Sequence, residues 1–150
     1  MASMRDDVDD ELRAHGERLA AAITAAIPGW VVRSVVERGG PRPAAAAAGA
    51  AAAAEAGPRL HALLTADVDD QRANPLAVVR GLVAHPTSVL REVGIEPPPR
   101  SRFDAEHFPE DPYGLVPMTW RDLDESLHEP GIVWGALKAR AHRQRHGGRA

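Results

Sequence analysis

Apolar and polar positions alternate with a helical period at the start of the chain. The apolar stripe takes alternating steps of four and three residues, and its members are Val8, Leu12, His15, Leu19, Ala22 and Ala26, with Ile23 and Ile27 beside them. Residues at these steps share one helix face, so the stripe predicts an amphipathic helix of about five turns. Acidic residues fill the first turns, where the helix dipole favours negative charge. Pro28-Gly29 is expected to end this helix.

Two following stretches allow more than one interpretation. Residues 30–38 (WVVRSVVER) hold four valines, which are typical of strands, but their apolar pairs repeat every four residues. We expect a helix there and keep a strand as the alternative. In residues 44–56, eleven of thirteen are alanine, which has a high helix propensity but buries little area. This tract is either a helix supported by a neighbour or a low-complexity linker, and the sequence favours the helix.

Turn signals divide the middle of the chain. After Gly57-Pro58, leucines restore a helical face. Asn74 followed by Pro75 predicts an N-cap and a new helix that ends near His85. A short helix then begins at residue 87 or 88, with Gly94 in the left-handed position after its end and Ile95 folded back onto it.

A proline-rich loop and two helices complete the pattern. The loop, residues 97–118, carries enough apolar side chains that we expect it to pack across the helices without regular structure. Thr119 and Asp122 predict a capping box for a short helix. Pro130 is expected to start the last helix, whose apolar side is predicted to be Ile132, Val133, Trp134, Ala136, Leu137 and Ala141.

These elements predict an all-α fold, a compact bundle of about five to seven helices with the proline-rich loop packed across it. A chain of 150 residues suits one folded unit. Within it we distinguish four segments: an N-terminal helical hairpin (1–43), an Ala-rich helix or linker (44–57), a main helical core (58–137) and a basic C-terminal tail (138–150).

Composition narrows the functional classes. Seventeen arginines against one lysine, with many alanines, indicate coding bias in a GC-rich bacterium. The chain has no cysteine, which removes disulfides, thiolate metal sites and cysteine nucleophiles. The acidic N-terminus does not resemble a signal peptide. No apolar run is expected to approach the ~20 residues that a membrane helix needs. A cytoplasmic protein is the expectation.

Charge is segregated along the chain. The net charge is −3, yet residues 138–149 carry five basic side chains, two histidines and no acid, which leaves −8 on the rest. The tail could bind phosphates of RNA or DNA through Lys138, Arg140, Arg143 and Arg145. Alternatively, it docks on the acidic first helix of the same chain or of a second copy in a homodimer, or it is a solvated helix end. The sequence favours the solvated and intramolecular interpretations.

No phosphate-binding loop, dinucleotide fingerprint, zinc-protease motif or nucleophile elbow occurs in the sequence. The best metal candidate is His61 with Asp67, Asp69 and Asp70, whose oxygens suit a hard cation; these acids are also typical of an exposed connection. A second cluster could hold a general base, or it is an ordinary acidic turn: Asp104, Glu106, His107, Glu110 and Asp111. No cofactor is expected.

The pattern favours a non-enzymatic protein-interaction (adaptor or regulatory) protein. Its expected mode is docking of the first helix in a partner's groove through Leu12, Leu19, Ile23 and Trp30. The alternatives are an accessory nucleic-acid or ribonucleoprotein factor that uses the basic tail, and a small metal-dependent hydrolase. No motif resembles the signature of a known family, and the partner is not identified by the sequence.

Overall fold

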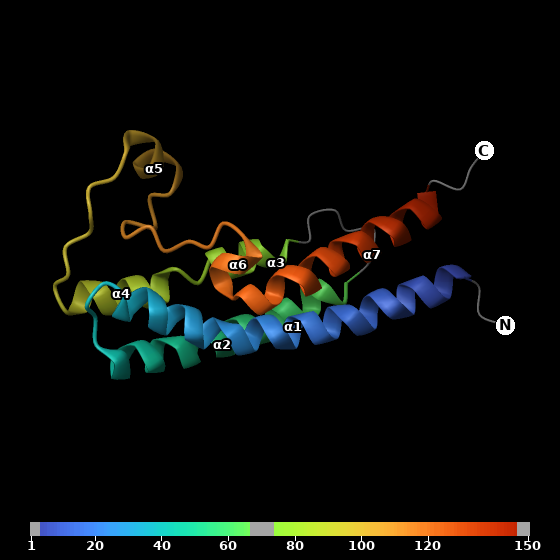
Figure 1. Cartoon of the computed structure of the whole chain (residues 1–150), viewed down its shortest axis with the longest axis horizontal. Helices are drawn as coiled ribbons and strands as arrows, with labels where there is room; N and C mark the ends of the chain where they lie inside the picture. Colours follow the sequence, from blue (N-terminus) through green and yellow to red (C-terminus); the bar gives the residue numbers. More distant parts are fainter. Residues whose placement is uncertain (1–3, 67–73, 147–150) are drawn as a thin grey trace.

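The computed structural model describes residues 4–66 and 74–146, and all regular structure in these ranges is helical. The helices form an elongated bundle (Figure 1), which confirms the all-α prediction. In chain order they are α1 (Met4–Val36), α2 (Arg42–Leu64), α3 (Pro75–Arg80), α4 (Ala84–Glu92), α5 (Arg102–His107), α6 (Trp120–Leu123), the 3₁₀ turn η1 (Glu125–Leu127) and α7 (His128–His146).

The long α1 continues through Pro28, so the predicted stop at Pro28-Gly29 is wrong. A proline inside a helix removes one hydrogen bond and costs about 3 kcal/mol. Packing offsets this cost, because the buried face continues beyond the proline with Trp30, Val31 and Val35, all at most 3% exposed. Residues 30–36 are therefore helical, as predicted, but they extend the first helix instead of forming a second one.

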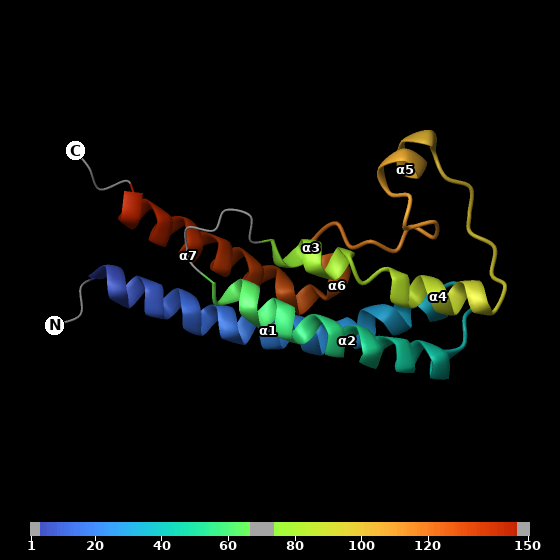
Figure 2. The same ribbon diagram turned by 180° about the vertical axis from the view of Figure 1, so that it is seen from behind.

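The Ala-rich tract forms most of α2, which runs antiparallel to α1 (Figure 2). Its buried residues recur every three or four positions and are Ala45, Gly49, Ala52, Ala56, Leu60 and Leu64. Gly49 allows a close approach, since a Cβ there would lie 2.9 Å from the Cα of Pro28. The helix is thus supported by a neighbour, as favoured from the sequence, and it passes through the expected break at Gly57-Pro58 without interruption.

Two short helices, α3 and α4, lie along α1 and α2. The side chain of Asn74 accepts from the amides of Leu76 and Ala77, which confirms the predicted N-cap. However, α3 ends at Arg80 and α4 begins at Ala84, so the helix boundary expected near residues 85–88 is wrong. Proline is tolerated in the first turn of a helix, and Pro86 lies within that turn of α4.

The predicted turn at Gly94 is confirmed. Gly94 has φ 74°, its amide donates to the carbonyl of Arg91, and the amide of Ile95 donates to that of Leu90. These are the two hydrogen bonds of a Schellman motif.

The chain returns to the bundle through α6, η1 and α7. Thr119 and Asp122 form the predicted capping box. Asp124 caps η1, and its hydrogen bonds from the Ser126 hydroxyl and amide hold the pKa of this carboxyl below its ordinary value. The last helix starts at His128, two residues before the predicted start. Its predicted apolar side is only partly correct, because Ile132 and Val133 are exposed and Trp134 and Ala141 are buried.

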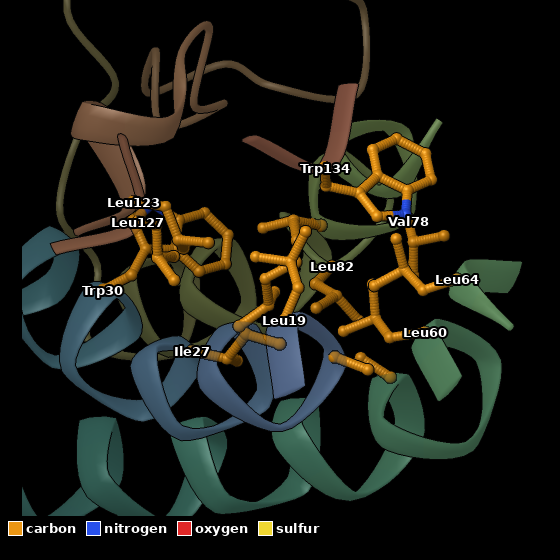
Figure 3. Packing of buried hydrophobic residues seen from close by; sticks show 14 of the residues in the cluster. Leu19, Ile27, Trp30, Leu60, Leu64, Val78, Leu82, Leu123, Leu127 and Trp134 are labelled. Atoms are coloured by element: carbon orange, nitrogen blue, oxygen red, sulfur yellow. The ribbon is translucent and has the colours of Figure 1, made fainter. Parts of the chain in front are cut away.

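The main core lies between α1, α2, α3 and α7, and Leu123 of α6 and Leu127 of η1 join it beside Trp30 (Figure 3). It contains aliphatic side chains from every one of these helices, with Trp30 at one end and Trp134 near the other. A second, smaller cluster lies near the α1–α2 connection and includes Val35, Val83, Leu90, Tyr113 and Leu115. The second cluster positions the loop described below.

One helix among the described residues, Val8–Val36, is long and apolar enough to cross a membrane by length and composition alone. This corrects the expectation that no apolar run approaches that length. Length and composition do not distinguish a membrane span from a core helix, and α1 contributes fully buried side chains such as Ile23, Ile27 and Val31 to the core.

Candidate functional site

Residues 95–118 form an arm that leaves the bundle after α4 and returns before α6. Figure 1 shows α5 standing away from the other helices at the tip of this arm. No residue of α5 is buried. The loop predicted to pack across the helices therefore does so only at its base, and its prediction as irregular throughout is wrong because Ser101 caps a helix by accepting from the amide of Asp104.

Apolar packing fixes the base of the arm. Tyr113 and Leu115 are 2% and 6% exposed and belong to the second core cluster. The hydroxyl of Tyr113 donates to the carbonyl of Ile95 at 2.5 Å. Because these residues lie on the returning and outgoing segments of the arm, this bond closes the arm at its base.

Two arginines of the bundle also hold the returning segment. Arg38 Nη2 donates to the carbonyl of Tyr113 at 3.1 Å. Arg80 donates to two successive carbonyls, from Nε to Pro117 at 3.1 Å and from Nη2 to Met118 at 3.2 Å. A guanidinium has five donors in a fixed plane, so it can bridge carbonyls that belong to no helix or strand. Side chains from α3 and from the turn after α1 thus position the arm.

A buried carboxylate orders the turn inside the arm. Asp111 is 6% exposed and accepts from the amides of Leu115 at 2.7 Å and Val116 at 2.9 Å. Gly114, with φ 68°, provides the left-handed residue that this turn requires. On the other side, Arg100 Nη1 donates to the carbonyl of Phe108 at 2.8 Å. Polar bonds to backbone groups therefore replace the missing helical hydrogen bonds of this segment.

The two sides of the arm enclose an open pocket of about 300 Å³. Its lining combines prolines and apolar side chains with three charged residues, Arg100, Asp104 and Asp111, and also includes Pro98, Phe108, Tyr113 and Met118. Two large apolar side chains of the arm face solvent, with Phe103 61% and Met118 55% exposed. Such a pocket is at the small end of the range for ligand sites.

The predicted general base in this arm is not supported by its geometry. His107 Nδ1 lies 2.9 Å from the carbonyl of Phe103, to which it donates, and its ring stacks on Phe103 with centroids 4.0 Å apart. Glu106 pairs with Arg102 at 2.9 Å. Asp111 accepts backbone amides, and within the described residues no carboxylate is hydrogen-bonded to His107.

The predicted metal site cannot be assembled from the described residues. His61 is exposed on the last turns of α2, while Asp67, Asp69 and Asp70 lie outside the described residues. Within residues 4–66 and 74–146, no three His, Asp or Glu side chains are placed to hold a metal ion.

The predicted partner-binding face is covered by the protein's own helices. Leu12, Leu19, Ile23 and Trp30 are 7%, 1%, 0% and 3% exposed and belong to the main core. The helical period was correct, but it identified the face that α2, α3 and α7 cover. This face is not available for docking in a partner's groove.

The basic residues of α7 have different environments. Arg145 Nη2 lies 2.7 Å from a carboxylate oxygen of Asp9 on α1, as the intramolecular interpretation predicts. The ammonium of Lys138 lies 5.1 Å from the centre of the Trp134 ring. Arg140 and Arg143 are exposed. Two of the four residues predicted to bind nucleic acid therefore contact the protein itself.

The sequence did not reveal the two arginines of the bundle that anchor the arm. Nothing in the sequence around Arg38 or Arg80 indicates that their targets are backbone carbonyls more than 35 residues away. The signal that was present is the combination of prolines with aromatic residues in 97–118.

Comparisons with models of protein families, with curated proteins and with solved structures find no match for the chain.

Proposed function

We propose that the protein is a non-enzymatic interaction protein that binds another protein through the arm, residues 95–118. The observation that carries the proposal is the arm itself, which is held by the bundle and presents a pocket with exposed apolar side chains. Large exposed apolar groups on an ordered segment are typical of binding surfaces.

Preorganisation supports this proposal. The order of a binding segment has an entropic cost, and a segment that is already ordered when free avoids most of it. Arg38, Arg80 and Tyr113 order the arm through bonds to its backbone, and these bonds leave Phe103 and Met118 facing solvent. The bundle acts as a scaffold in this proposal, and the proposed docking site moves from the first helix to the arm.

The test is capture of partners from a lysate of the source cells by the tagged protein. The variant Phe103→Ala/Met118→Ala removes two exposed side chains of the arm and is expected to reduce recovery of the specific partner at least about tenfold, as for interface anchors. The matched control is Ile132→Ala/Val133→Ala, which truncates two exposed apolar side chains of α7 (56% and 40% exposed) and is expected to keep the partner. The recovered protein is then purified and its affinity measured directly.

Two outcomes would contradict the proposal. Equal recovery by the arm variant and the wild-type protein would exclude the arm as the docking element. Loss of all partners after nuclease treatment would favour the accessory nucleic-acid function, with Arg140 and Arg143 as the exposed cations of α7.

A further inference from the structure

The arm, residues 95–118, is acidic. Residues 95–118 contain five carboxylates against two arginines, a formal net charge of −3. The arginines are largely engaged within the arm, since Arg100 donates to the carbonyl of Phe108 and Arg102 pairs with Glu106. The surface that remains for a partner is therefore acidic.

Two of these carboxylates are exposed beside the pocket. Asp104 lines it from α5, and Glu110 lies one residue before the buried Asp111, which also lines it. Neither carboxylate accepts a hydrogen bond or forms an ion pair in the described part of the chain. Asp111 differs from them, because both of its oxygens already accept backbone amides.

The apolar part of the pocket lies next to these charges. Phe108 and Met118 line the pocket, and Met118, which is 55% exposed, is a flexible side chain that adapts to different partners. A volume of about 300 Å³ accommodates one apolar side chain and not a folded element.

We infer that the pocket takes one apolar side chain of a lysine- or arginine-rich peptide segment presented by the partner protein. This inference rests on the proposed function and names the chemistry of the partner. The apolar side chain contacts Phe108 and Met118, while flanking cations pair with Asp104 and Glu110. Complementary charge at an exposed rim sets specificity and salt dependence more than total affinity.

The probes are three synthetic peptides: a leucine flanked by lysines, the same leucine flanked by glutamates, and a glycine flanked by lysines. Each is titrated into the full-length ¹⁵N-labelled protein and followed by amide chemical shifts. The lysine–leucine peptide is expected to shift the amides of Asp104, Tyr113 and Val116. The glutamate peptide is expected to shift none of them, and the glycine peptide to bind several-fold more weakly.

Charge neutralisation gives the second measurement. Asp104→Asn/Glu110→Gln is expected to lower the affinity for the lysine–leucine peptide about fivefold at low salt, which is the effect expected from the loss of two exposed ion pairs. The matched control is Glu11→Gln/Glu17→Gln, which makes the same change in net charge on exposed residues of α1 and is expected to leave the affinity unchanged. Raising the salt concentration should abolish the difference between the two variants.

The inference is overturned if the glutamate peptide shifts the same amides, if the shifts lie outside the arm, or if the control variant weakens binding as much as Asp104→Asn/Glu110→Gln. Its failure is distinct from failure of the proposed function. If a partner needs Phe103 and Met118 but binds Asp104→Asn/Glu110→Gln with normal affinity, the arm is still the docking element. The inference of a basic peptide segment is then wrong.

Discussion

The α1–α2 hairpin and the arm are ordered by different forces. In the hairpin, side chains such as Ile23 and Leu60 are fully buried, and the helices supply their own backbone hydrogen bonds. In the arm, only the base is buried, and backbone groups find partners in Arg38, Arg80 and Asp111. The hairpin therefore depends on apolar area, whereas the arm depends on a few directed polar bonds. A segment of the second kind can keep its surface free for a partner.

The largest expected effect is in the hairpin. Ile23→Ala should lower the free energy of unfolding by about 2–5 kcal/mol, because a fully buried side chain leaves a cavity. Urea denaturation followed by circular dichroism measures this loss. A change below about 1 kcal/mol would instead agree with an Ile23 side chain that is exposed and can dock in a partner's groove.

The corresponding change in the arm should have a local effect. Asp111→Ala leaves the buried amide of Leu115 and the partly buried amide of Val116 without their acceptor, at a cost of about 1–3 kcal/mol. Limited proteolysis should then cut within residues 95–118 while the bundle stays intact. The exposed Asp104→Ala serves as the control, and simultaneous digestion of arm and hairpin would contradict the separation between them.

Substitutions at two glycines test how closely α1 and α2 pack. Gly49→Ala places a Cβ 2.9 Å from the Cα of Pro28 and should destabilise the hairpin by about 1 kcal/mol, despite the better helix propensity of alanine. Gly135→Ala on α7 meets no atom within 4 Å and should stabilise by about 0.5–1 kcal/mol. Thermal denaturation should show opposite signs, and equal signs would refute the close α1–α2 contact.

The smallest effect is expected where the arm rejoins the bundle. Ser126→Ala removes the hydroxyl that is the main cause of the lowered pKa of Asp124, so this pKa should rise towards its ordinary value. A lowered native pKa stabilises the fold above the ordinary pKa of the carboxyl, and this contribution is lost as the pH falls through the native value. In Ser126→Ala, the stability that is lost on acidification through the pKa of Asp124 should therefore be smaller than in the wild-type protein. Carboxyl ¹³C titration measures the shift, and an unchanged pKa would exclude the hydroxyl as its cause.

The sequence predicted the local signals well and the long-range ones poorly. Asn74, the capping box at Thr119 and the turn at Gly94 were recognised because each acts over a few residues. The stop at Pro28 was wrong because tertiary packing outweighs a local cost. An amphipathic stripe also looks the same whether a partner or the chain itself covers it, which is why the buried face of α1 was first assigned to docking.

The candidate site also depends on long-range contacts that the sequence did not predict. Its prolines and aromatic residues were visible in the sequence, but its anchoring by Arg38 and Arg80 depends on pairing of segments far apart in the chain. The metal hypothesis remains a prediction, because three of its four residues lie outside the described part of the structure.

Amide hydrogen exchange in Arg38→Met/Arg80→Met tests most directly whether polar bonds order the arm. Methionine keeps much of the apolar stem and removes the donors to Tyr113, Pro117 and Met118. Exchange in residues 95–118 should accelerate at least about tenfold, while α1 and α2 keep wild-type rates. Equal acceleration in both regions, or none in the arm, would contradict this account.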